Sequence, residues 1–187
     1  MEAAERQASY GFLRALFCDL PTEEFAVTVV SRAKVYPDEP GSADILAFWE
    51  QESTEDRLRH IAVDRARLFR GTAPDEVLIP YESLHRGRPA AATAAELASL
   101  YERASLRLSA DAHESPEYFG VECGFAEHLI DTGQAELEQE LLADHLVPFG
   151  ASVADEMRAR AQTGFYRGLG AMMAAFFSQE QARLAAC

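Results

Sequence analysis

The stretch DAHESPEYFGVECGFAEHL, residues 111–129, decides the fold that this sequence predicts. Ser115, Pro116 and Glu117 are typical of a helix start, because serine caps free backbone N–H groups, proline at the first helical position loses no hydrogen bond, and an acid suits the positive helix end. Beyond that start, apolar residues recur at spacings of four, three and four, namely Phe119, Cys123, Ala126 and Ile130, with Glu122 and Leu129 on the flanks. The stretch therefore predicts an amphipathic helix that begins at Ser115 and ends at Gly133.

Other parts of the chain also carry apolar residues at helical spacing. We predict helices over residues 8–20, 22–35, 42–49, 54–70, 93–109 and 137–148, then a segment with Val153 and Met157, and a last helix with Phe165, Leu169, Met172, Phe176 and Phe177. A stripe of methionine and phenylalanine is usually core, so we expect it to be buried. No stretch alternates apolar and polar residues over a convincing length. The predicted fold is all-α, a single-domain helical bundle that spans residues 1–187.

Composition restricts the class of protein and its partners. With 187 residues and 48% hydrophobic content, the chain is long and apolar enough for one folded domain. Its net charge of −14 argues against nucleic acid and would attract a basic peptide, although acidity that serves only solubility is an open alternative. No apolar run approaches the roughly twenty residues of a membrane span, and the N-terminus lacks a basic region followed by an apolar core. We therefore expect a cytoplasmic protein without stable membrane insertion.

The residues of the central stretch also match a family pattern. The pattern E-x-P-D-H-x-x-x-E-x-x-F-x-x-x-L of the TorD/DmsD/NarJ family of redox enzyme maturation chaperones resembles the run formed by Glu114, Pro116, Glu117, Glu122, Phe125 and Leu129. Glu117 stands where the family usually has Asp, and Tyr118 where it usually has His. Any role of that His is therefore not carried over to this chain.

Two further patches resemble the same family. An L-F-x-G turn followed by P-Y-x-S resembles Leu68, Phe69 and Gly71 followed by Pro80, Tyr81, Glu82 and Ser83. The C-terminal pattern H-L-x-x-W followed by F-Y-x-x-L resembles His145, Leu146 and Phe149 followed by Phe165, Tyr166 and Leu169, with Phe149 in place of Trp. The patches span most of residues 68–169. The resemblance implies the same all-α fold.

The resemblance also implies a function. Members of the family bind the N-terminal twin-arginine signal peptide of a molybdenum-containing oxidoreductase, keep the precursor from premature export and help cofactor insertion. Such a peptide has a basic front and an apolar body, so its partner needs carboxylates beside an apolar groove. On this basis we predict that Tyr81, Tyr118 and Phe119 hold the apolar part. The arginines would face Glu82, Glu114, Glu117 and Glu122, and Ser83 completes the site.

The residues leave several alternatives open. Phe119 is also compatible with a position in the core, and Glu122 with a carboxylate that merely flanks the buried stripe. Tyr81 and Ser83 could serve only to shape a turn. The client enzyme is not identified by the sequence. A monomer and a domain-swapped dimer are both compatible with the resemblance, and the loop over residues 71–89 would be the hinge of a swap.

Enzymatic and metal chemistry find little support in the sequence. Glu82 and His85 have the E-x-x-H spacing of di-iron bundles, but no second pair exists. The candidate acid and base groups are ordinary helix residues, namely His113, Glu117, Glu122, Glu127 and His128. Three cysteines, two of them expected to be buried, suggest neither a disulfide framework nor a metal site. We expect no catalytic residue, metal or cofactor; a general acidic helical adaptor and a small helical enzyme are the alternatives to a chaperone.

Overall fold

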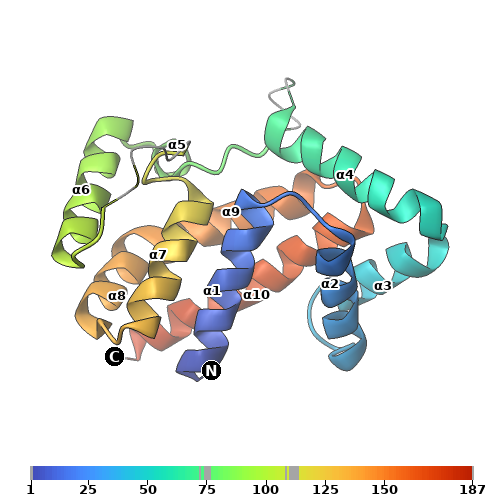
Figure 1. Ribbon diagram of the computed structural model, residues 1–187, viewed down its shortest axis with the longest axis horizontal. Coiled ribbons are helices and arrows are strands. Elements are labelled where there is room, and N and C mark those ends of the chain that lie inside the picture. Colours follow the sequence, from blue (N-terminus) through green and yellow to red (C-terminus); the bar gives the residue numbers. More distant parts are fainter. Residues whose placement is uncertain (1, 72, 74–76, 108, 110–113, 187) are drawn as a thin grey trace. The chain divides into compact units, whose positions relative to one another are not determined.

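The computed structural model describes residues 2–71, 73, 77–107, 109 and 114–186. Every regular element within these residues is a helix (Figure 1), which confirms the all-α prediction. The only extended pairing in the same residues is an isolated antiparallel bridge between Tyr81 and Tyr118. His113 and Cys187, which the sequence brought into consideration, lie outside the described residues. No helix in the described part of the chain is long and apolar enough to cross a membrane.

The helices are joined by connections of very different length, the longest being residues 71–81 and 104–118. They are α1 Ala3–Cys18, α2 Glu23–Val35, α3 Ser42–Gln51, α4 Thr54–Arg70, α5 Glu82–Arg86, α6 Ala90–Arg103, α7 Phe119–Asp131, α8 Ala135–Leu141, the π-helix η1 Leu142–Leu146, α9 Val147–Arg160 and α10 Gly164–Ala185. They group into two compact units. Unit 1 consists of Met1–Leu20, Pro80–Phe149 and Arg183–Cys187, and unit 2 consists of Pro21–Ile79 and Gly150–Ala182. The expectation of one domain over residues 1–187 stays a prediction.

The core of unit 1 lies between α1 and α7, which pack side by side (Figure 1). The ring of Phe17 on α1 lies 4.5 Å from the ring of Phe119 on α7, and Phe119 in turn contacts the ring of Phe149 at 5.6 Å. A Cβ atom at Gly120 would lie 2.5 Å from the Cys18 Sγ atom, so the close approach of the two helices requires glycine there. The buried stripe predicted for α7 is thus the face that α1 covers.

The start of α7 differs from the prediction. The helix begins at Phe119 with Tyr118 as its N-cap, and Ser115 makes no cap. Instead, Ser115 accepts a hydrogen bond from the Tyr118 N–H at 3.0 Å and closes a turn. The extended backbone of Tyr118 pairs with a distant segment, and this pairing replaces the first helical turn that the local sequence favours. Tertiary contacts therefore override a good local start signal.

Two further helix predictions and one prediction of burial need correction. α6 runs from Ala90 to Arg103 instead of over residues 93–109, because three alanines extend it back to Pro89 and the Thr93 hydroxyl bonds the Pro89 carbonyl from inside the helix. The stretch over residues 71–89, expected to lack helix, contains α5. Cys123 is buried but Cys18 is exposed, so burial of a second cysteine is not seen in the described residues.

Unit 2 is built around the start of α10. Phe165 is fully buried and lies 6.4 Å from the ring of Phe25 on α2 and 6.3 Å from that of Phe48 on α3. The core stripe continues through Leu169, Met173 and Phe177. The prediction of a methionine and phenylalanine core is confirmed, although Met172 and Phe176, one residue off this line, are half-buried. At the start of α3, Gly41 has φ +88°, and a Cβ atom there would lie 2.1 Å from the Gly168 carbonyl oxygen.

Candidate functional site

Two segments that are distant in the sequence meet in unit 1. Tyr81 and Tyr118 form the antiparallel bridge, and their rings meet edge to face at a centroid distance of 5.4 Å. The Phe119 N–H donates to the Pro80 carbonyl at 2.9 Å, and the Glu82 N–H donates to the Glu117 carbonyl at 3.1 Å. The structure thus brings together the P-Y-x-S residues and the turn that precedes α7.

Glu117 supports the start of α5. This carboxylate is buried, and its Oε2 atom accepts a hydrogen bond from the backbone N–H of Ser83 at 2.9 Å. An acceptor at a helix start satisfies an N–H group that has no partner inside the helix. α5 has only five residues, so it depends on such external support. The Glu117 side chain therefore holds the two segments in register.

Glu82 is a buried carboxylate with several cationic or donor partners. Its Oε1 atom lies 2.6 Å from Arg86 and 3.8 Å from Arg88, and its Oε2 atom lies 2.9 Å from the Nδ1 atom of His145. These partners replace the water that a side chain with 0% exposure has lost. Glu82 and His85 had suggested an E-x-x-H pair, whereas the actual partner is His145 on η1. Sequence reasoning missed this role, although the H-L-x-x-W resemblance already contained His145.

Glu122 is also fully buried, and its surroundings differ. Neither of its carboxylate oxygens has a hydrogen-bond partner within the described residues. Burial raises the pKa of Glu122 well above its usual range, the nearby Glu82 and Glu117 raise it further, and Arg86 only partly opposes them. The surroundings of Glu122 therefore favour the protonated form of its carboxyl group. The expectation that Glu122 sits at the edge of the helix face is wrong, because it lies inside the core.

The apolar candidates of the site are divided between core and surface. Phe119 is fully buried, and the buried Tyr118 donates its hydroxyl to the Phe17 carbonyl at 3.0 Å. Tyr81 is half-buried. Phe119 was considered as a peptide contact and as a core residue, and in the structure it lies in the core.

The exposed part of the site is the Tyr81 patch, formed by Tyr81, Leu84 and Glu114. The Tyr81 hydroxyl donates to the Glu114 Oε2 atom at 2.6 Å. Partial burial, followed by the hydrogen bond to Glu114, raises the pKa of Tyr81 to about 12. Leu84 follows one turn later on α5 and is 65% exposed. The patch thus offers one accessible carboxylate beside apolar surface.

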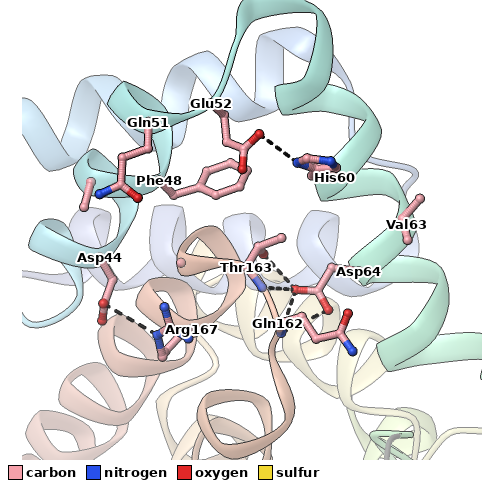
Figure 2. A pocket seen from close by; sticks show the side chains of 12 residues that line it. Asp44, Phe48, Gln51, Glu52, His60, Val63, Asp64, Gln162, Thr163 and Arg167 are labelled. Atoms are coloured by element: carbon pink, nitrogen blue, oxygen red, sulfur yellow. Dashed lines mark hydrogen bonds and ion pairs between the residues drawn. The ribbon is translucent and has the colours of Figure 1, made fainter.

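A second buried carboxylate network lies in unit 2 and was missed from the sequence. Asp64 on α4 accepts hydrogen bonds from the backbone N–H of Thr163 at 2.7 Å, from the Thr163 hydroxyl at 2.7 Å and from the Gln162 N–H at 3.1 Å (Figure 2). Arg67 adds an ion pair at 2.9 Å. Asp64 therefore fastens α4 to the start of α10. Thr163 directly before the predicted helix was the available signal, because threonine is a common cap.

The site contains no constellation for metal binding or catalysis in the residues described. No group of three or more histidine, cysteine, aspartate or glutamate side chains there could hold a metal ion. The buried Cys123 thiol has a pKa well above its usual range because of burial and then the neighbouring Glu122, so it is a poor nucleophile. The arrangement joins chain segments and presents a small acidic and apolar surface.

The fold and the site define an all-α protein with a small acidic and apolar surface at the Tyr81 patch. A family model described as nitrate reductase delta subunit matches residues 37–155, more than half of the chain. The chain belongs to this family, which confirms the resemblance seen in the sequence. No curated protein matches it. The family consists of chaperones for the maturation of molybdoenzymes, and its members are not themselves enzymes.

Proposed function

We propose that this protein binds the twin-arginine signal peptide of a molybdenum-containing oxidoreductase precursor in the cytoplasm. Binding would delay export until the cofactor has been inserted. The observation that carries this proposal is the Tyr81 patch, in which Glu114 presents an exposed carboxylate beside Tyr81 and Leu84. Both segments of the patch belong to family signatures.

The chemistry of the patch suits the two parts of such a peptide. Glu114 offers oxygen acceptors for a guanidinium group, and the contact is charge-assisted. Tyr81 and Leu84 offer apolar surface for the residues that follow the arginines. The net charge of −14 adds a long-range attraction for a basic peptide.

The burial of the other acids narrows the assignment of contacts. Glu82, Glu117 and Glu122 are buried, so we assign the first contact with an arginine to Glu114. The hydrogen bond from the Ser83 N–H to Glu117 fixes the start of α5, which carries Leu84 of the Tyr81 patch. The contact between Glu82 and His145 fixes α5 against η1. Tyr118 supports the Tyr81 patch because its backbone forms the bridge with Tyr81, and Phe119 anchors the same segment in the core.

The proposal extends to the partner and leaves the assembly state to measurement. The partner would be the precursor of a nitrate reductase-type catalytic subunit, in keeping with the family. Light scattering of the purified chain, alone and with peptide, would separate a monomer from a domain-swapped dimer.

Calorimetric titration tests the proposal. We expect a peptide with two adjacent arginines to bind more tightly than its Lys-Lys version, because arginine pairs with a carboxylate through two parallel hydrogen bonds. Glu114→Gln should weaken binding about tenfold, which corresponds to about 1.4 kcal/mol. Tyr81→Ala should also weaken binding but leave its salt dependence unchanged, because it removes apolar area.

The matched control is Glu140→Gln, which removes an exposed glutamate of unit 1 that pairs with Arg103. It should leave affinity unchanged. Equal binding of the Arg-Arg and Lys-Lys peptides would favour the general acidic adaptor. No binding of either peptide would contradict the proposed function.

A further inference from the structure

Unit 2 contains a cavity that the proposed function does not use. Its volume is about 510 Å³, and it lies between α3, α4 and the start of α10 (Figure 2). This volume falls in the range of about 300–1,000 Å³ that is usual for ligand pockets. Charged, amide and apolar side chains from all three elements share its lining.

The charges in the lining do not all cancel. Asp44 lies 3.5 Å from Arg167, and Asp64 is paired with Arg67. Glu52 is different, because its only ion-pair partner in the described residues is His60, with 2.8 Å between Oε2 and Nδ1. This pair uses only one of the two carboxylate oxygens of Glu52.

The Glu52 side chain keeps one oxygen open to a ligand. Its Oε2 atom contacts His60, whose Nε2 atom lies 3.2 Å from an Arg59 Nη2 atom, and Arg59 is itself paired with Asp56 at 2.6 Å. The Oε1 atom of Glu52 has no hydrogen-bond or ion-pair partner within the described residues, and no arginine or lysine there pairs with this carboxylate. Glu52 therefore offers a free acceptor at the cavity.

The rest of the lining suits a polypeptide chain. Phe48 and Val63 contribute apolar surface, and Val63 is exposed. The side-chain amides of Gln51 and Gln162 come from different elements, as Figure 2 shows, and neither makes a hydrogen bond within the described residues. A primary amide carries both donors and an acceptor, which matches the N–H and C=O groups of an extended backbone.

We propose that this cavity binds an extended polypeptide segment through one arginine side chain. The guanidinium group pairs with Glu52, the aliphatic stem lies against Phe48 and Val63, and the two glutamines bond the backbone of the segment. This site goes beyond the proposed function and is independent of the Tyr81 patch.

The experiment uses NMR titration of the full chain with acetyl-Ala-Ala-Arg-Ala-Ala-amide. The comparison peptide replaces arginine by citrulline, which has nearly the same shape and no charge. The arginine peptide should shift the side-chain amide signals of Gln51 and Gln162 and the ring signals of His60. The citrulline peptide should bind at least tenfold more weakly.

Two variants and a matched control identify the contacts. Glu52→Gln should lower the affinity about tenfold, and Gln51→Ala, at an exposed position, should lower it less. Glu39→Gln removes another acid of unit 2, one that pairs with Arg32 and does not line the cavity, and it should bind like the wild type. Spectra of each unliganded variant establish that it is folded.

Three outcomes of the NMR titration would overturn the proposal that the cavity binds an arginine side chain. Equal binding of the arginine and citrulline peptides, or equal loss in Glu39→Gln and Glu52→Gln, would overturn the proposal. Shifts confined to Tyr81 and Glu114 would also overturn it, because the peptide would then occupy the Tyr81 patch. Since Glu114→Gln leaves the cavity unchanged, failure of the signal-peptide test and failure of this one are separate results.

Discussion

Asp64 in unit 2 and Glu122 in unit 1 are both buried carboxyl groups, with 1% and 0% exposure. Asp64 receives hydrogen bonds from Gln162 and Thr163 and an ion pair from Arg67, whereas neither oxygen of Glu122 has a partner in the described residues. A carboxylate can stay charged in a protein interior only where donors replace the lost water. Asp64 therefore joins two helices through its hydrogen bonds, whereas the surroundings of Glu122 favour the protonated form of that acid.

The largest expected effect is at Asp64. Asp64→Ala should lower the free energy of unfolding by about 3–5 kcal/mol, because it removes one side of a buried ion pair with Arg67 and the acceptor of the backbone N–H groups at the α10 start. Urea denaturation measures this loss. Asp64→Asn is the companion variant: it keeps one acceptor and should fall between Asp64→Ala and the wild type. A loss below about 1 kcal/mol for Asp64→Ala would show that Asp64 does not stabilise the contact between α4 and the start of α10.

Glu122 should make the stability of the protein depend on pH. Its pKa is raised in the folded protein, so the unfolded chain releases the proton at a pH where the folded protein still holds it. Stability from this group is complete below the usual pKa of a glutamate and is lost as pH rises, by at most about 1.4 kcal/mol per pH unit, until the raised pKa is reached.

Glu122→Gln should remove that slope, because glutamine resembles a protonated glutamate and cannot ionise. Urea denaturation of both proteins at several pH values from 5 to 8 is the measurement. The infrared carbonyl band of a protonated carboxylic acid, present in the wild type and missing in Glu122→Gln, is an independent check. Parallel pH profiles would show that Glu122 ionises in the folded protein.

The smallest expected effect is at Glu117, a buried acid that accepts the hydrogen bond from the Ser83 N–H. Glu117→Gln keeps an oxygen that can accept from the Ser83 N–H and loses only the charge at the start of α5. We expect a loss of less than about 1 kcal/mol, the usual size of a charge effect at a helix end. Glu117→Ala should cost more, because the N–H group then loses its acceptor. Equal losses would assign the effect to packing.

Part of the fold and little of the site could be predicted from the sequence. The helix predicted from residue 22 to residue 35 is α2, and Phe119, Cys123 and Ala126 are buried on the expected face of α7, while Ile130 is half-buried. The site residues were gathered from family signatures, and the structure brings Tyr81 and Tyr118 together. Their roles as peptide contacts stay predictions.

The sequence by itself determined the helical class, because helix periodicity, caps and breakers act between residues a few positions apart. Only the tertiary structure decided where α7 begins and what each acid does. Ser83 and Glu117 are 34 positions apart, and Glu82 and His145 are 63 apart. Hydrogen bonds over such separations form only after the helices have packed, so a local pattern carries no record of them. The same packing gave donors to Asp64 and, in the part of the chain that the structure describes, none to Glu122.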